Sequence, residues 1–434
     1  MDVSKHLSDI VGNVDYASLK EPEGKPLRVL SLFAGCGGMD LGMEGGFIAN
    51  KKSFPKDDAR IERVLNDDWV LLRKTRFKTV LANDILPEAA TAWTNYMSRF
   101  GYGPDVYDLN SVVELVKRWN AGDHKVFPRN IDVVTGGFPC QDFSLAGKRM
   151  GFDSQKDDLG RKRTGDKPSE ESRGKLYFWM KQVIDIVRPK LFIAENVKGL
   201  VNFGNVKDII QGDFASADGN GYIVLDPRVL HAADYGVPES RERVIFIGVR
   251  RDALKPEALK ALESKRVPDK YCPYPKPTHA YTTKDEYLLP PVFTCDVLKG
   301  LKEPEETVDE SQRVYSKAKY LGKGKQGQIE IRMDGIGPTI RSEHHGNIEF
   351  RRLSHEHGGI HFEELYNGMK ERRLTPRECA MIQTFPPDYA FVMNGPEGKV
   401  SASGAYKIIG NAVPPVLAYN IATRVQEIWP KYFS

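Results

Sequence analysis

Short apolar runs alternate with helix-like segments along most of this chain, and the alternation limits the folds that it can adopt. The runs that are typical of strands are 27–33, 79–82, 131–135, 190–194, 222–225 and 244–249. Helical patterns cover 84–99, 175–187, 375–385 and 413–428. Strands that alternate with helices predict an α/β protein with a doubly wound, mostly parallel sheet.

The composition changes along the chain, and these changes predict a second, smaller domain. Residues 1–26 form a polar lead-in, whereas 27–250 and 372–434 carry the alternating pattern. Residues 251–371 are rich in Pro, Gly, Lys and His and have little helical period. We therefore expect an irregular domain at 251–371, with one strand-like run at 328–333.

Cysteine usage and hydropathy exclude several classes of protein. The five cysteines are odd in number and widely spaced, and no CxxC pair indicates zinc, so we expect neither a disulfide framework nor a metal. The first residues lack the apolar core of a signal peptide, and no apolar run approaches the roughly 20 residues of a membrane span. These features predict a protein of a reducing cytoplasm without a membrane anchor.

The net charge is only +4, so basic clusters are more informative than the overall balance. Basic clusters lie at 73–78, 161–163 and 351–352. Each is either a set of phosphate contacts or a solvated charged face. Separately, the charged and weakly periodic stretch 50–78 is interpreted as an insertion.

The apolar run 131–135 is followed by the sequence GGFPC, whose last residue is Cys140. The two glycines allow a sharp turn where the strand stops, and the proline disfavours the start of a helix. We therefore expect Cys140 on a loop at the carboxyl edge of the sheet, where open α/β folds bind ligands. The alternative is a small buried thiol.

A glycine-rich turn follows the first apolar run and is typical of a nucleotide-like ligand. Gly35 and Gly37 let a ligand approach the backbone, although their spacing differs from the dinucleotide fingerprint. Asp84 ends the second run and can accept hydrogen bonds from ribose hydroxyls. Asp108 follows a third expected strand and can hold an adenine amino group. Alternatively, either acid is a helix N-cap.

Glu195 ends the buried run 190–194 and is the candidate acid. A carboxyl group at such an edge can have a raised pKa and donate a proton near neutral pH. Arg241 and Arg243 are two residues apart, so we expect both side chains on one side of a strand. Beside Cys140, two guanidinium groups can bind a base edge and stabilise a thiolate. The alternatives are a helix cap for Glu195 and surface ion pairs for all three.

Five elements in this order resemble the DNA (cytosine-5)-methyltransferases, especially those of bacterial restriction–modification systems. The resemblance covers about 27–250 and 372–428. It implies a class I S-adenosylmethionine-dependent methyltransferase fold. The elements are FAGCGGMDLG, GGFPCQDFS, ENV, ESRERV and GNAVPP.

The resemblance also implies roles for individual residues. Cys140 is the implied nucleophile that adds to carbon 6 of a flipped-out cytosine, and Glu195 is the implied proton donor to the base ring nitrogen. Arg243, with Arg241, is the implied contact to the base. S-adenosylmethionine is the implied methyl donor, in a pocket formed by Phe33, Gly35, Gly37, Asp84, Ile85, Asp108, Leu109, Leu176 and Asn411.

The family has a variable target-recognition domain, and the irregular segment 251–371 matches its place in the chain. Thr339, Arg341 and Asn347 are the candidates for contacts with bases, because Arg and Asn suit guanine and adenine edges in the major groove. Alternatively, these residues only hold a compact, loop-rich domain together.

Two features depart from the family pattern. The family usually has Gln at the position of Glu239, and Glu keeps an acceptor but loses the amide donor and adds a charge. A polar insertion at 153–172 separates Cys140 from the Ser-Arg-Gly that begins the next helix. This insertion either contacts the DNA backbone or only adds length.

The implied substrate is double-stranded DNA, and the implied functional partner is a cognate restriction endonuclease. We expect a monomer in the bacterial cytoplasm, associated with the nucleoid and not with a membrane. Two alternatives share these motifs: a tRNA cytosine-5 methyltransferase of the same fold and a catalytically silent DNA-binding protein. A nucleotide-binding oxidoreductase is a third, but it leaves the Pro-Cys and Glu-Asn-Val elements unexplained.

Overall fold

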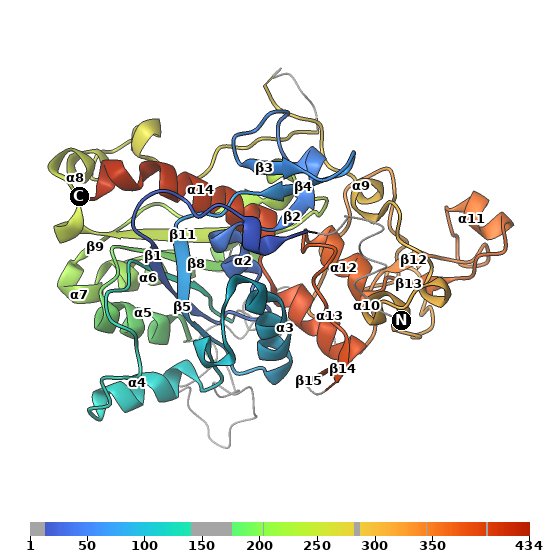
Figure 1. Cartoon of the computed structure of the whole chain (residues 1–434), viewed down its shortest axis with the longest axis horizontal. Coiled ribbons are helices and arrows are strands. Elements are labelled where there is room, and N and C mark those ends of the chain that lie inside the picture. Colours follow the sequence, from blue (N-terminus) through green and yellow to red (C-terminus); the bar gives the residue numbers. More distant parts are fainter. Residues whose placement is uncertain (1–13, 140–175, 203, 282–286, 344, 396–397) are drawn as a thin grey trace.

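The computed structural model describes residues 14–139, 176–202, 204–281, 287–343, 345–395 and 398–434. Its centre is an eight-stranded sheet with the order β10-β11-β8-β7-β1-β5-β6, in which β9 also pairs with β11 (Figure 1). Helices cover both faces of this mostly parallel sheet, which confirms the predicted fold class.

Five parallel strands form the middle and one side of the sheet. They are β1 (Leu27–Leu32), β5 (Phe77–Asn83), β6 (Tyr107–Asp108), β7 (Val133–Gly137) and β8 (Leu191–Val197). Their carboxyl ends meet at one edge, called here the carboxyl edge; the opposite one is the amino edge. β11 (Glu242–Arg250) is antiparallel to β8, β9 (Tyr222–Val224) and β10 (Arg228–His231).

Two apolar clusters lie on the two faces of the sheet, because successive strand residues point to opposite sides. On β1, Val29 belongs to one cluster, whereas Leu30 and Leu32 belong to the other. The first cluster packs against α2 (Gly38–Glu44), α3 (Pro87–Met97) and α14 (Pro415–Tyr432). The second packs against α4 (Val112–Asn120), α5 (Leu176–Val187) and α6 (Val206–Ala215), and α7 (Ala217–Asn220) follows α6. Within the described ranges, no helix is both long and apolar enough to span a membrane.

The stretch 50–78, expected as a weakly patterned insertion, contains most of a small antiparallel sheet. Its order is β2 (Ile48–Asn50), β4 (Trp69–Leu72) and β3 (Ile61–Val64). All four residues of β4 are buried. A charged stretch can therefore fold here, because its one short apolar strand lies between β2 and β3 and is covered. The central strand β5 already begins at Phe77, inside the stretch.

The region that was expected to form the smaller domain has short elements and long connections. They are α8 (Pro256–Leu262), α9 (Thr294–Leu298), α10 (Glu310–Arg313), β12 (Phe350–Arg352), α11 (Phe362–Tyr366) and β13 (Arg372–Arg373). The predicted strand at 328–333 is wrong, because only an isolated bridge joins Glu330 to Phe350 there. The chain returns through α12 (Pro376–Ile382), β14 (Met393–Gly395), β15 (Gly398–Val400) and α13 (Ala402–Asn411).

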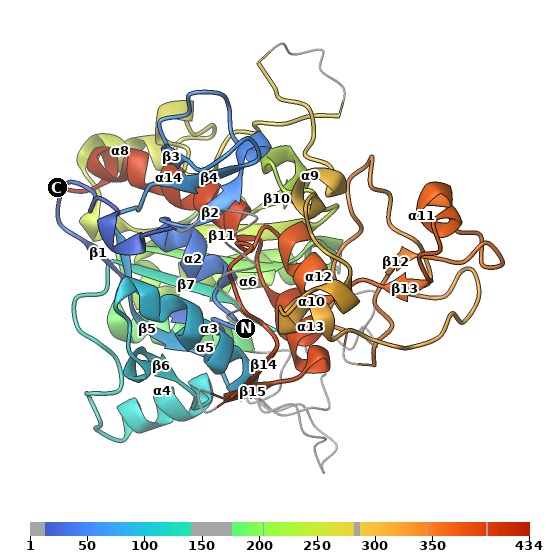
Figure 2. The same cartoon turned by 45° about the vertical axis from the view of Figure 1, so that its right-hand side comes forward.

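The first part of this region packs on the central sheet and on α14 rather than on the outer lobe. In Figures 1 and 2, α8 lies beside α14, whereas α11, β12 and β13 lie at the other end of the molecule. The Tyr274 hydroxyl donates to the carbonyl of Ile245 in β11 at 3.0 Å. Lys255 N donates to the carbonyl of Tyr432 in α14 at 2.8 Å. The lobe that is separate from the sheet therefore begins after Tyr274. We call the described residues from there to the end of β13 the target region.

Candidate active site

Glu195 occupies a central place at the carboxyl edge, between two strands. It lies opposite Gly137 in the parallel strand β7 and opposite Ile245 in the antiparallel strand β11. The residue is only 7% exposed. This burial results from the strand order, which places β8 between β7 and β11.

The expectation that Gly136 and Gly137 form a turn is wrong, because both belong to β7. Their lack of a side chain serves close packing instead. A Cβ at Gly137 would lie 2.9 Å from Glu195 Oε2, and one at Gly136 would lie 2.9 Å from Met180 Sδ. Both distances are shorter than real contacts, so the glycines make the space that the Glu195 carboxyl group and α5 occupy.

Arg243 forms the electrostatic partner of Glu195, with 2.8 Å between Arg243 Nε and Glu195 Oε1. Burial raises the pKa of Glu195, and the charges of Arg243 and Arg241 oppose this rise. The balance leaves the pKa above its ordinary value. A carboxyl group in this environment can hold a proton closer to neutral pH and is held in one orientation.

Asn196 holds the end of β7 and was missed by the sequence-based reasoning as a residue with its own role. Its Nδ2 donates to the carbonyl of Phe138 at 3.0 Å, and its Oδ1 accepts from Val197 N at 2.8 Å. The segment that leads to Cys140 is thereby tied to β8 beside Glu195. Its position next to Glu195 in the ENV element is the signal that could have identified it. Cys140, the insertion 153–172 and the basic cluster 161–163 lie outside the described residues.

The glycine-rich turn after β1 has the backbone geometry of a ligand-binding turn. Gly35 and Gly37 have φ of +55° and +81°, and Phe33 has φ of +53°. A Cβ at Gly37 would lie 2.6 Å from Trp93 Cδ1, whereas one at Gly35 would meet nothing within 4 Å. Gly37 is therefore required for packing against α3, and the Gly35 side of the turn is open.

Asp84 connects the end of β5 to this turn. Its Oδ2 accepts from Gly35 N and its Oδ1 from Leu86 N, each at 3.0 Å. Burial raises its pKa, and these N–H groups with that of Ile85 oppose the rise. Asp84 is not the cap of α3, whose N-cap is Leu86. The carboxylate has about four acceptor sites, which exceeds these three N–H donors, so Asp84 can also accept from a ribose hydroxyl.

The end of β6 lies beside the same turn. The Tyr107 hydroxyl donates to the Gly35 carbonyl at 2.8 Å, and Asp84 N donates to the Asp108 carbonyl at 3.2 Å. The Asp108 side chain accepts from Asn110 N at 2.7 Å, and it does not cap α4, whose N-cap is Ser111. Seven predicted cofactor residues therefore follow three neighbouring strands: Phe33, Gly35, Gly37, Asp84, Ile85, Asp108 and Leu109.

The other two predicted cofactor residues come from helices. Leu176 is buried at the first described residue of α5, and Asn411 is the exposed last residue of α13. Cys36, inside the glycine-rich turn, donates through Sγ to the carbonyl of Ile408 at 3.3 Å. The turn is thus in direct contact with α13, three residues before Asn411.

The target-region candidates for base contacts have partners within the protein. The Thr339 hydroxyl donates to the Ser240 carbonyl. Arg341 donates to Glu349 Oε1 at 2.7 Å and to the Asn347 carbonyl at 3.3 Å. These contacts are what the alternative, structural interpretation of the three residues predicts.

The described basic clusters of the sequence are not arranged as phosphate contacts. In the cluster 73–78, Arg73 pairs with Glu62 at 3.2 Å and Lys74 with Glu21 at 2.6 Å, just before β5 at the amino edge. In the cluster 351–352, Arg352 is fully buried and pairs with Glu303 and Glu364. Neither cluster presents unpaired cations at the carboxyl edge.

Unpaired cations occur instead in residues 317–326 of the target region, called here the lysine loop. Lys319, Lys323 and Lys325 are exposed, and the described chain places no carboxylate within ion-pair distance of them. Buried Arg373 donates to the carbonyls of Ala318, Lys319 and Gly327 at 2.6, 2.9 and 2.9 Å. One guanidinium group therefore fixes both ends of the loop.

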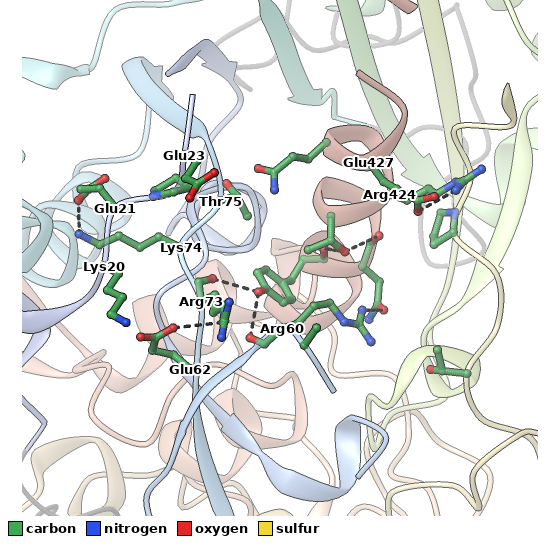
Figure 3. Close-up of a pocket in the computed structure, with 18 of the residues that line it drawn as sticks. Lys20, Glu21, Glu23, Arg60, Glu62, Arg73, Lys74, Thr75, Arg424 and Glu427 are labelled. Carbon is green, nitrogen blue, oxygen red and sulfur yellow. Dashed lines mark hydrogen bonds and ion pairs between the residues drawn. The ribbon is translucent and has the colours of Figure 1, made fainter. Parts of the chain in front are cut away.

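A cleft of about 940 Å³ lies away from these residues. It is lined by the lead-in, by residues just before β5 and by α14, and Figure 3 shows its Lys74–Glu21 and Arg73–Glu62 pairs. Because β5 runs from this cleft toward Asp84, the cleft is at the amino edge. The candidate active site is the carboxyl edge, where Glu195 and Asp84 lie.

Comparisons with known proteins agree with this geometry. The family model described as C-5 cytosine-specific DNA methylase matches residues 27–427. The chain is 30% identical over 429 residues to the Type II methyltransferase M.BsuRI of Bacillus subtilis, covering 96% of this chain and 82% of the relative. It is 30% identical over 424 residues to M.Eco47II of Escherichia coli, covering 93% and 79%.

Solved structures share the fold at lower identity. A Dnmt2 methyltransferase of S. pombe has a TM-score of 0.52 at 15% identity, covering 93% of this chain and 99% of that one. The methyltransferase EhMeth of Entamoeba histolytica has a TM-score of 0.53 at 16% identity, covering 93% and 98%. The family match over nearly the whole chain confirms the resemblance found in the motifs. The chain belongs to the C-5 cytosine-specific DNA methylase family.

Proposed function

We propose that this DNA cytosine-5-methyltransferase moves the methyl group of S-adenosylmethionine to carbon 5 of a flipped-out cytosine in a specific duplex sequence. The observation that carries the proposal is the buried Glu195–Arg243 pair, 2.8 Å apart and next to the strand that leads to Cys140. An acid, a cation and a cysteine are the groups that this chemistry requires.

Carbon 5 of cytosine is a poor nucleophile, and attack at carbon 6 solves this problem. In the proposed reaction the Cys140 thiolate forms a bond to carbon 6, and Glu195 gives its proton to the ring nitrogen. Arg243 fixes the Glu195 carboxyl group during this transfer. When bound, S-adenosylmethionine supplies an electrophilic methyl group to carbon 5. The carbon 5 proton is then lost to water and the ring nitrogen returns its proton to Glu195. The bond to Cys140 breaks, the thiolate leaves and the ring is restored.

The residues around the glycine-rich turn fit this cofactor. Asp84 can accept from a ribose hydroxyl in addition to the N–H groups that it already binds. The open side of Gly35 lets a ligand approach the backbone. Leu109 is 47% exposed beside Asp108, where an adenine ring can cover it. Ile85, Leu176 and Asn411 complete the proposed pocket.

The relatives are named as Type II methyltransferases, and we extend this role to the present chain. In that role it protects the cell's own DNA from a cognate restriction endonuclease. The partner then recognises the same sequence and need not bind the methyltransferase. A monomer in the bacterial cytoplasm, at the nucleoid, is sufficient for this work.

The test is methyl transfer from labelled S-adenosylmethionine to unmethylated bacterial DNA and, separately, to tRNA. We expect label in DNA as 5-methylcytosine and none with Cys140→Ser. Label in tRNA alone would assign the protein to the RNA-modifying branch of the fold. Binding of the cofactor without transfer to either acceptor would support a silent DNA-binding protein.

A further inference from the structure

The four residues before β11 join the catalytic sheet to the target region. Gly337 N donates to the Pro238 carbonyl at 2.9 Å, and Ser240 N donates to the Gly337 carbonyl at 2.8 Å. Glu239 and Gly337 form a parallel bridge. The segment 337–341 of the target region is therefore bound to the backbone that leads directly to Arg243.

Arg241 lies inside this junction and is 1% exposed. Its Nη1 donates to the Ile340 carbonyl at 2.8 Å, and its Nη2 donates to the carbonyls of Gly410 and Ala412 at 2.9 and 2.7 Å. These carbonyls come from two segments that are far from Arg241 in sequence. Both terminal nitrogens donate to backbone carbonyls, and Nη1 also contacts the Glu239 carboxylate, which differs from the base contact expected from the sequence.

Glu239 completes the junction and is fully buried. Its Oε1 accepts from Ile340 N at 2.7 Å and lies 3.5 Å from Arg241 Nη1. Its Oε2 has no hydrogen-bond partner in the part of the chain that the structure describes. Glu239 and Arg241 therefore bind the same residue of the target region, Ile340. Glu239 accepts from the Ile340 N–H, and Arg241 donates to the Ile340 carbonyl.

The turn at 410–412 packs directly on the target region. A Cβ at Gly410 would lie 2.1 Å from the carbonyl carbon of Arg341 and 2.2 Å from Ser342 N. Asn411, the next residue, belongs to the proposed cofactor pocket. The junction therefore contacts the target region, the cofactor side and the strand of the Glu195–Arg243 pair at the same time.

We propose that Arg241 is a positioning residue, which with Glu239 locks the segment 337–341 and the turn 410–412 onto the start of β11. This inference rests on the proposed function, because it assigns the locked elements to DNA and cofactor binding. Arg241 holds three buried carbonyls in a fixed fork, a geometry that Lys cannot reproduce. Its replacement leaves carbonyls without donors, so both elements lose their fixed place.

The experiment compares Arg241→Lys with the wild type in two binding constants and one rate. We expect the Kd for S-adenosylmethionine, measured by calorimetry, and the KM for unmethylated plasmid DNA each to rise about tenfold. The rate at saturation and its pH profile should stay close to the wild type, because Glu195 and Arg243 are intact and Lys keeps the positive charge near Glu195. An unchanged Kd and KM with a large loss of kcat would overturn the proposal in favour of a direct base contact.

Three comparisons make this test decisive. Arg424→Lys is the matched control, because Arg424 donates to the Cys272 carbonyl at 2.9 Å on the side of the molecule remote from the junction. Arg424→Lys should lower the melting temperature but leave the Kd for S-adenosylmethionine and the KM for DNA unchanged. If Arg424→Lys and Arg241→Lys raised these two constants equally, the proposal would be overturned. Glu239→Gln keeps the acceptor for Ile340 N and should restrict both changes to about threefold, whereas Glu239→Ala should resemble Arg241→Lys.

The binding measurement also separates the two hypotheses. If the wild type methylates no DNA, the proposed function fails, while the calorimetric Kd for S-adenosylmethionine still tests the junction. If Arg241→Lys does not fold, Glu239→Ala provides the same test through the Ile340 contact. An unchanged Kd in Glu239→Ala would then refute the positioning role.

Discussion

Glu195 is subject to two opposing influences on its protonation. Burial raises its pKa, and the nearby guanidinium groups of Arg243 and Arg241 lower it, with burial the larger. An acid catalyst needs a proton at working pH and an orientation that does not change. The low exposure of Glu195 supplies the first property, and its 2.8 Å contact with Arg243 supplies the second.

The raised pKa of Glu195 gives the reaction a defined pH dependence. The carboxyl group is protonated below this pKa, so kcat/KM should fall as the pH rises through it. Glu195→Gln should lower kcat/KM by roughly 10²–10⁴-fold and remove this alkaline limb, because the amide does not titrate. A pH series of methyl transfer with both proteins checks this, and an identical alkaline limb in the variant would assign the titration to another group.

A second prediction concerns Gly137, whose lack of a side chain leaves space for the Glu195 carboxyl group. In Gly137→Ala the new Cβ would lie 2.9 Å from Glu195 Oε2, so the carboxyl group must shift from its present position beside Arg243. We expect kcat to fall about tenfold or more, as for other small displacements of catalytic groups, with an unchanged Kd for S-adenosylmethionine. Gly212→Ala in α6, where a Cβ meets nothing within 4 Å, is the control. A wild-type rate in Gly137→Ala would show that Glu195 tolerates displacement.

The sequence predicts Glu195 and Arg243 as site residues from their positions beside apolar runs. Glu195 directly follows the run 190–194, and Arg243 directly precedes the run 244–249. The sequence does not predict the partners of Arg241, because Ile340 and Gly410 are 99 and 169 positions away. Spacing within a strand indicates which side a residue can face, but burial by a distant segment decides what it contacts. The glycines of β7 were misassigned for the same reason, since the atoms they accommodate belong to other elements.

The secondary-structure elements were predicted best where an apolar run is buried on both faces of the sheet. The predicted runs lie inside β5 and β11, and those for β1 and β8 extend one residue beyond the strand. A strand that is buried on both faces is apolar along its length, so composition alone identifies it. The small sheet of β2, β4 and β3 was not predicted, since each strand is short and its stability comes from pairing. The run 328–333 has strand-like composition, but among the described residues its one β-bridge is between Glu330 and Phe350.

The lysine loop is the element from which we expect salt-dependent DNA binding. Replacing Lys319, Lys323 and Lys325 by Gln should reduce the slope of log K against log salt concentration by up to about 3, because each lost phosphate contact removes about 0.9. The fold should be retained, because the ends of the loop are fixed by Arg373 through backbone carbonyls. Fluorescence anisotropy with duplex DNA at several salt concentrations measures the slope.

The matched control for the lysine loop uses exposed lysines near α8. Replacing Lys260, Lys265 and Lys270 by Gln removes the same charge from the end of the molecule where α14 lies. We expect the slope of this variant to equal that of the wild type. Equal reductions in both variants would mean that only the net charge of the protein matters.

At the scale of the whole molecule, α2, which follows the first strand, packs against α14, the last helix of the described chain. α14 packs against α2 so closely that a Cβ at Gly42 would lie 2.3 Å from Ala418 Cβ. Gly42→Ala should therefore lower the free energy of unfolding by about 1–3 kcal/mol through overpacking, although Ala favours helices. Urea titration measures the change, and Gly212→Ala again controls for helix propensity. A stabilised Gly42→Ala variant would show that α14 can move away from α2.

The packing of the glycine-rich turn and α2 against α13 and α14 has a consequence for the synthesis of the protein. Cys36 of the glycine-rich turn donates to Ile408, 372 residues later, and Gly38 and Gly42 pack against the segment that begins α14. While the ribosome is still translating the last tenth of the chain, the turn after β1 lacks these neighbours. Premature termination before α13 therefore yields a chain that contains Glu195 and Arg243. This chain lacks α13 and α14, the helices that pack against the glycine-rich turn and α2. Activity should appear only when translation is complete.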